Sequence, residues 1–164
     1  MAKIHIPGDG HVVPLPSMLP SGATIQWLAV SDPKQKKVIS DALHILTHNV
    51  KGVKPCNDCF KNLPNGRTFD DLLNDAAIFI SVDPSNDVNL FGAALGNDIT
   101  ITNSCIRKGR WTVAATLVHE LAHVNGAPGN DHQAEGTLLC CGFKKLHDVT
   151  IIGSRDGNSG TRLV

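Results

Sequence analysis

The chain of 164 residues contains no tyrosine, and only 4% of its residues are aromatic. It has no excess charge of either sign, because 15 Lys and Arg balance 15 Asp and Glu. A neutral chain offers no net field to attract nucleic acid or an anionic membrane. It also lacks a run of about 18 apolar residues, the minimum for a transmembrane helix. We therefore expect no nucleic-acid partner and no membrane span.

The N-terminal stretch MAKIHIPGDG breaks into Pro and Gly before the apolar core of a signal peptide could form. The chain is therefore expected to be cytoplasmic as made, or exported by a signal-independent route. Its length and its apolar content of 41% fit one globular domain over residues 1–164. Residues 1–22 are expected to be an extended lead-in, and residues 154–164 a flexible tail.

The chain has five cysteines, and an odd number argues against a fully paired disulfide framework. CNDC, at Cys56 and Cys59, resembles half of a zinc site or a redox motif, but no second CxxC follows it. Cys140 and Cys141 are adjacent, which is poor geometry for joint metal ligation. We predict structural cysteines, buried or bridged, rather than cysteine chemistry.

Hydrophobic periodicity and turn residues predict an α+β fold. Helices are expected over 31–50, 68–75, 111–125 and about 130–143, and strands over 23–30, 77–83, 98–102 and 148–154. Residues 51–66 are expected to be loop, whereas 89–95 (NLFGAAL) could be loop or a short edge strand. The 111–125 helix has apolar residues nearly all round, so it should be buried. Gly126 and Pro128 should end it.

This buried helix carries HELAH, which places two histidines four residues apart on one face. That spacing suits two ligands of one tetrahedral Zn²⁺, His119 and His123. Glu120 is offset by about 100° around the helix, so it can act as general base on a zinc-activated water without being a ligand. Burying these polar groups without a metal would be costly. We predict a catalytic zinc ion here.

A second histidine pair, His44 and His48, has the same spacing on the 31–50 helix. It has Ile45 where a catalytic glutamate would be needed, and no acidic residue follows until Asp58. This pair is expected to lie on a half-exposed helix face.

A catalytic zinc needs a third protein ligand. The downstream candidates are Asp131, His132, Glu135 and His147. Glu135 is preferred because the chain has thirteen Asp and only two Glu, so the longer side chain is kept at two places, 120 and 135. His132 is the alternative ligand; otherwise it could donate a hydrogen bond to the oxyanion, a role that no tyrosine can fill here.

HELAH on a buried helix after mixed strands resembles the zincin class of zinc metallopeptidases. Gly126 is similar to the glycine of the metzincin pattern, but Gly129 stands where the third histidine of that pattern would be. The spacing to Glu135 is close to that of the aspzincins, whose GTxD motif is absent. The resemblance implies a zincin-like fold, in which a small mixed sheet packs on the HExxH helix and on a following ligand-bearing helix. It also implies a peptide or protein substrate held along an edge strand, NLFGAAL or DITIT.

Two alternatives remain. A zinc amidase similar to peptide deformylase would take its third ligand from an upstream cysteine, for which Cys105 is the candidate. A zinc- or disulfide-stabilised binding module would have no activity. Compact metallopeptidase domains also occur as bacterial toxins or effectors, and an inhibitor or immunity protein as partner is unknown.

Overall fold

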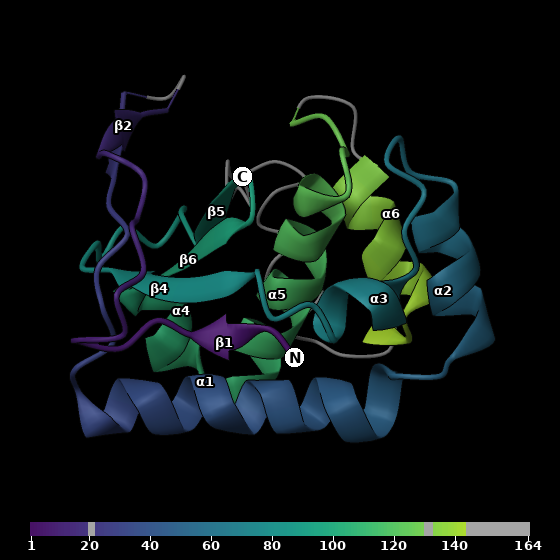
Figure 1. The fold of residues 1–164 in the computed structure, drawn as a ribbon, viewed down its shortest axis with the longest axis horizontal. Helices are drawn as coiled ribbons and strands as arrows, with labels where there is room; N and C mark the ends of the chain where they lie inside the picture. Colours follow the sequence, from purple (N-terminus) through teal and green to yellow (C-terminus); the bar gives the residue numbers. More distant parts are fainter. Residues whose placement is uncertain (20–21, 130–132, 144–164) are drawn as a thin grey trace.

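The computed structural model describes residues 1–19, 22–129 and 133–143, which form an α+β fold (Figure 1). A four-stranded mixed sheet has the order β1-β4-β6-β5. Its strands are β1 (Lys3–Ile4), β4 (Phe79–Asp83), β6 (Asp98–Thr102) and β5 (Gly92–Leu95). The first three are parallel, and β5 pairs antiparallel with β6 at the edge of the sheet. A separate hairpin joins β2 (Ser17–Met18) to β3 (Thr24–Ile25).

The two faces of the sheet differ because side chains alternate along each strand. On one face four buried aliphatic residues join the main core: Ile80, Val82, Ile99 and Ile101. The other face is polar, and residues 5–19 and 22–28 lie over it. There the Thr100 hydroxyl donates to the Gln26 carbonyl (2.8 Å), and the Gln26 amide donates to Asp83 (2.7 Å). The imidazole of His11 stacks on Phe79.

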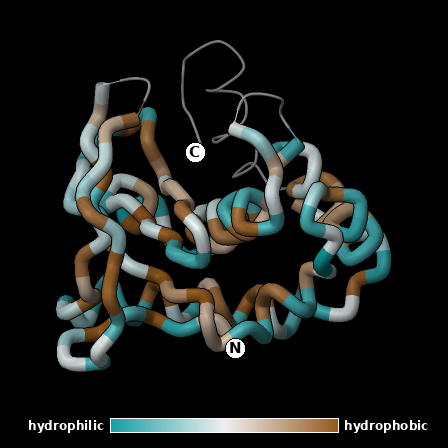
Figure 2. The backbone as a smooth tube through the Cα atoms, turned by 45° about the horizontal axis from the view of Figure 1, so that its top comes forward, coloured by the Kyte–Doolittle hydropathy of each residue, from teal (hydrophilic) through white to brown (hydrophobic). Residues whose placement is uncertain are grey.

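Helices cover the apolar face. They are α1 (Pro33–Ile45), the π-helical turn η1 (Leu46–Val50), α2 (Lys54–Lys61), α3 (Phe69–Leu73), α4 (Asn103–Lys108), α5 (Arg110–Val124) and α6 (Gln133–Cys140). Helix α5 stands between the sheet on one side and α6 and α2 on the other (Figure 1). Along the backbone of the helices, hydrophobic residues alternate with hydrophilic ones, as expected of helices that pack one face on a core (Figure 2). None of the helices in the described ranges is long and apolar enough to cross a membrane.

Most of the expected elements are confirmed. The 31–50 helix begins at Asp32, whose side chain accepts from the amide of Lys34, and continues through η1 to Val50. The 68–75 segment contains α3, with a capping box between Thr68 and Asp71. Strands β4 and β6 lie at 77–83 and 98–102, and NLFGAAL contains the edge strand β5. DITIT forms β6, which is interior, between β4 and β5.

One expectation was wrong, and two features were not expected. Residues 51–66 are not all loop, because Pro55 occupies the first turn of α2, where a missing amide costs nothing, and Cys56 and Phe60 form its buried face. Helix α4 was not expected; the Thr102 hydroxyl caps it by accepting from the Cys105 amide. The lead-in 1–22 also contributes two short strands that were not expected, β1, which pairs with β4, and β2.

The strand expected over 23–30 is shorter than its apolar run. It contains only the two residues of β3 and a single bridge between Leu28 and Val82. The main-chain groups of Gln26 bond to side chains of the sheet instead of to a neighbouring strand. The expected strand 148–154 and the tail 154–164 lie outside the described residues.

The cysteines are structural, as predicted. Cys56 and Cys59 on α2 form disulfides with Cys141 and Cys140, respectively, at the end of α6. Cys105 is free and fully buried, and burial raises the pKa of its thiol to about 12. The two bridges tie α6 to α2 on the side of α5 that faces away from the sheet.

Candidate metal centre

Helix α5 carries the candidate site on a buried surface. Eleven of its residues are buried, from Thr112 to Ala122, as the apolar composition of this helix predicts. His119 and Glu120 are 1% and 0% exposed, whereas His123, one turn later, is only partly buried. His119 is thus enclosed by the core, whereas His123 lies between the core and solvent.

The two imidazoles converge at their Nε2 atoms. The Nε2 atoms of His119 and His123 lie 3.0 Å apart, and the ring planes are inclined by 68°. Two nitrogens bound to one tetrahedral zinc at 2.0–2.1 Å would be about 3.3 Å apart. A shift of a few tenths of an ångström would therefore let both rings hold the same ion, so this pair fits zinc.

The tautomer of His123 is fixed by the backbone. Its Nδ1 atom lies 2.7 Å from the carbonyl oxygen of Ala127. A carbonyl oxygen can only accept, so Nδ1 carries the proton, and the neutral ring presents the Nε2 lone pair. Metal-binding histidines commonly have such a partner behind the ring. The chain therefore supplies the outer contact that this ligand needs.

Glu120 projects from α5 toward the edge strand. A Cβ built on Gly92 of β5 would lie 3.0 Å from Glu120 Oε1. The carboxylate is thus packed directly against the backbone of β5, at a point where the strand has no side chain. This places an acidic group between the histidine-bearing helix and the edge of the sheet.

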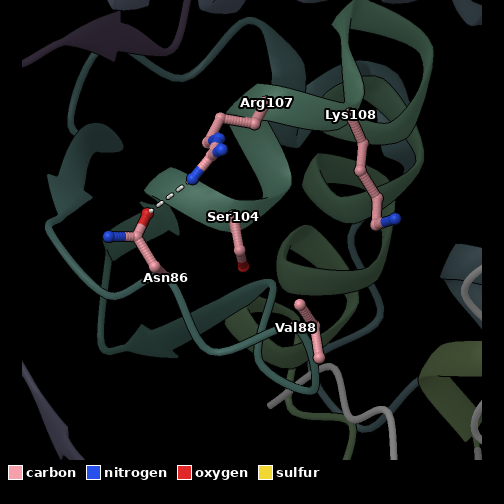
Figure 3. A pocket seen from close by; sticks show the side chains of 5 residues that line it. All are labelled: Asn86, Val88, Ser104, Arg107 and Lys108. Carbon is pink, nitrogen blue, oxygen red and sulfur yellow. Dashed lines mark hydrogen bonds between the residues drawn. The ribbon is translucent and has the colours of Figure 1, made fainter.

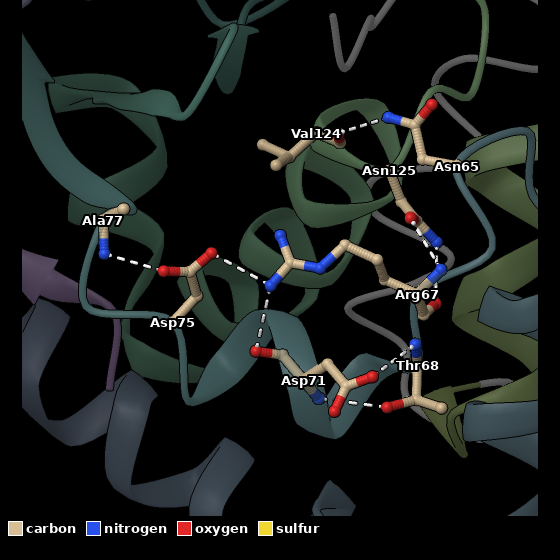
Figure 4. Close-up of polar contacts among 8 residues, drawn as sticks. All are labelled: Asn65, Arg67, Thr68, Asp71, Asp75, Ala77, Val124 and Asn125. Atoms are coloured by element: carbon tan, nitrogen blue, oxygen red, sulfur yellow. Dashed lines mark hydrogen bonds and ion pairs between the residues drawn. The ribbon is translucent and has the colours of Figure 1, made fainter.

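The turn after α5 is anchored to the loop between α2 and α3 (Figure 4). Asn125 is fully buried, and its amide nitrogen donates to the carbonyls of Phe60 and Arg67, each at 2.8 Å. Its side-chain oxygen accepts from the amide of Arg67 at 3.1 Å. Asn65 returns the contact, since its side chain donates to the Val124 carbonyl at 3.2 Å. The turn that presents the Ala127 carbonyl is therefore held by the neighbouring loop.

Gly126 and Arg67 complete this anchor. Gly126 has φ +92°, and a Cβ there would meet Pro64 and Asn65 at 3.0 Å, so glycine is required both by conformation and by space. Arg67 pairs with Asp75 at 2.9 Å. The backbone amide of Ala77 and the Arg67 guanidinium lower the pKa of Asp75.

The third ligand is not brought to the histidines in the described residues. Glu135 lies in the first turn of α6, which packs on α5, and its side chain is partly buried. Within the described ranges, no group of three or more His, Cys, Asp or Glu side chains is arranged to hold a metal. His132, Asp131 and His147 lie outside the described residues.

The second histidine pair lies on a helix face, as expected. His44 and His48 are both exposed, their rings stack with centroids 3.8 Å apart, and His48 Nδ1 bonds to the carbonyl of His44. Stacked rings do not direct two lone pairs at one point. Spacing alone therefore did not distinguish the two pairs, whereas ring orientation does.

Two cavities lie away from these groups. One of about 280 Å³ is lined by Asn86, Val88, Ser104, Arg107 and Lys108 (Figure 3). Arg107 lies 3.5 Å from the Asn86 side-chain oxygen there. The other, of about 260 Å³, is lined by Asn49, Val50, Trp111, Cys141, Gly142 and Phe143. Of the aromatic residues Phe91, Trp111 and Phe143, only Trp111 is exposed, because Phe91 and Phe143 belong to the core.

Sequence reasoning missed two residues beside the site, Gly92 and Asn125. A signal existed for Asn125, since Asn-Gly directly after a helix marks a capping turn. Nothing in the sequence indicated that Gly92 faces Glu120. Comparison with known proteins gives no further guidance, because no family model, no curated protein and no solved structure matches this chain.

Proposed function

We propose that this chain is a zinc-dependent metalloendopeptidase of the zincin type, which hydrolyses peptide bonds with Glu120 as general base. The observation that carries the proposal is the convergence of the His119 and His123 Nε2 atoms at 3.0 Å, beside a fully buried glutamate. Histidines that only stack on each other or face solvent would have no reason to direct their Nε2 atoms at one point. A metal ion would give the buried His119 and Glu120 and the partly buried His123 one shared chemical role.

His119 and His123 would be two of the ligands, and Glu135 or His132 the third. Helix α6 packs on α5, so Glu135 lies on an element that contacts the histidine-bearing helix. A bound zinc ion would act as a Lewis acid and bring the pKa of water toward ~7. The Nδ1 contact of His123 with Ala127 keeps its Nε2 lone pair available for the ion.

Glu120 would accept the proton of the attacking water at its carboxylate and pass it to the leaving amine. Its burial between α5 and β5 excludes bulk water and limits the positions that the carboxylate can adopt. The antiparallel edge strand β5 is the element along which an extended peptide would add as a further strand. Of the two edge-strand candidates, the interior position of β6 excludes DITIT.

The disulfides bear on where such an enzyme would work. Two bridges between α2 and α6 form and persist in oxidising compartments. They favour work in an oxidising compartment over residence in a reducing cytosol. A toxin or effector metallopeptidase would meet this condition, and its partners would be a protein substrate and an immunity protein or inhibitor.

Neither alternative function gains support from a specific contact. A deformylase-like site would need an upstream cysteine as ligand, but Cys105 is fully buried and its sulfur lies 3.3 Å from the Thr116 hydroxyl. A non-catalytic binding module would leave the buried Glu120 without a chemical role.

The test combines metal analysis with cleavage of a peptide library by the wild type and by Glu120→Gln. The enzyme should hold one equivalent of zinc and cleave peptides. The variant should keep zinc and fold but lose about 10²–10⁴-fold in kcat. A wild type that holds no zinc after zinc is added would end the proposal, and equal cleavage by both proteins would remove Glu120 from the mechanism.

A further inference from the structure

The glycine at position 92 is not required by its backbone conformation. Among the described glycines, nine have φ between +60° and +105°, a region that favours glycine, but Gly92 is not one of them. It lies within β5, where glycine weakens a strand because it has no side chain to pack. Another requirement must therefore explain it.

That requirement is space. A Cβ at position 92 would meet three atoms at 3.0 Å: Glu120 Oε1, the Thr100 carbonyl oxygen and Thr116 Cγ2. Position 92 pairs with Ile101 on β6, so its side-chain direction is toward the helical face of the sheet, where α5 lies. The Thr116 hydroxyl donates to the Thr112 carbonyl at 2.8 Å, which holds its methyl group in place.

We infer that Gly92 is a positioning residue for Glu120, and that the missing side chain forms the seat in which the carboxylate rests. This inference rests on the proposed function. Thr100 contributes a backbone atom and Thr116 lies one turn before Glu120 on a buried helix, so neither can move aside easily. The Glu120 carboxylate ends a flexible side chain and is the group that a methyl at position 92 would displace.

A methyl group at position 92 should therefore lower kcat alone. Displacing the general base by about 1 Å can cost about 10²-fold in rate. Glu120 is not a proposed ligand, so zinc should stay bound. Gly92→Ala should therefore retain one equivalent of zinc and an unchanged KM, while kcat falls by about 10²-fold.

A double-mutant cycle with Glu120→Asp separates positioning from general damage to the strand. Aspartate is shorter by one methylene, so its carboxylate withdraws from the seat and leaves room for a methyl group. In the Glu120→Asp background, Gly92→Ala should cost less than about threefold in kcat, because coupled residues are not additive. Gly136→Ala is the matched control, since a Cβ there meets nothing within 4 Å and its φ is ordinary.

Thermal unfolding of the metal-free proteins gives a readout that does not depend on activity. Gly92→Ala should lower Tm by roughly 3–10 °C through overpacking, and Glu120→Asp should restore part of that loss. If Gly92→Ala does not fold alone, the double variant should fold. A double variant that is equally unfolded would overturn the inference.

The remaining outcomes are distinct. Full kcat in zinc-loaded Gly92→Ala, or additive losses in the cycle, would overturn the positioning role while leaving the proposed function intact. A wild type without zinc and without cleavage would overturn the proposed function and this inference with it.

Discussion

His123 donates from Nδ1 to the carbonyl oxygen of Ala127 at 2.7 Å, four residues further along the chain. The acceptor belongs to the turn that ends the helix, so the end of α5 and the orientation of the ring are set together. Asn125 makes three hydrogen bonds that hold this turn to Phe60, on α2, and to Arg67, in the loop after it, so these distant segments also support the histidine. The candidate metal centre is thus held both by helix α5 and by the contacts of the turn that follows this helix.

Replacing either His119 or His123 by alanine should abolish stoichiometric zinc binding. Each would remove one of two convergent nitrogens, and we expect the zinc dissociation constant to rise by more than about 100-fold, beyond the range seen when an outer contact is lost. Zinc titration against a competing chelator measures this. The double variant His44→Ala/His48→Ala, with the same spacing across α1 and η1, should bind zinc as the wild type does, and a comparable loss there would show that the assay reports surface histidines.

Glu135→Ala should weaken zinc binding if α6 supplies the third ligand. The expected loss is again more than about 100-fold, and a cobalt-substituted protein should change its visible absorption because the coordination changes. Gln133→Ala, an exposed change in the same turn, is the control. Retention of a full zinc equivalent by Glu135→Ala would rule out this residue as ligand, and His132→Ala should then show the loss.

Asn125→Ala should destabilise the fold by about 2–4 kcal/mol. The change removes three hydrogen bonds of a fully buried side chain, each with a net contribution of about 0.5–1.5 kcal/mol, and leaves the amide and the carbonyl of Arg67 without this partner. Urea unfolding measures the loss. Asn62→Ala is exposed and should change stability by less than about 0.5 kcal/mol. Equal effects of the two changes would contradict the anchoring role.

The N-terminal segment should loosen in acid through Asp9. The amide of His11, then the side chain of His5, lower the pKa of Asp9 from 3.8 to about 2. A carboxyl group with a depressed folded-state pKa stabilises the fold above its ordinary pKa, and that contribution disappears as pH falls from about 4 to 2. Urea midpoints measured across this range should fall less steeply for Asp9→Asn than for the wild type, and also less steeply than for Asp41→Asn. A wild-type slope in Asp9→Asn would refute this prediction.

Local chemistry made α1, α3 and α5 predictable, because caps and periodic apolar residues lie within each segment. Helix α2 was missed because Pro55 and the polar residues around Cys56 are also typical of loops; only burial against α6, far along the chain, decides between the two. Strand β1 has two residues and exists because β4 offers a parallel partner. The residues of β1 alone do not predict this pairing.

The candidate site also contains residues that the sequence predicts and residues that it does not. His119, Glu120 and His123 follow from the repeat of one helix, and the structure brings the two histidines together. The seat at Gly92 and the anchor at Asn125 depend on contacts between segments about 28 and 58–65 residues apart, which no periodicity reports. The third ligand depends on how the segment before α6 turns, and a single sequence does not specify that path.

The disulfides are nested, since the 81-residue span from Cys59 to Cys140 lies within the 85-residue span from Cys56 to Cys141. Closing the larger loop restricts the unfolded chain by about 4–5 kcal/mol in the chain-entropy treatment, and the inner bridge then adds little. Its contribution is mechanical. A helix tethered at one point can rotate about that tether, whereas a helix tethered at two neighbouring points cannot, so the two bridges together fix the direction of α6 relative to α2.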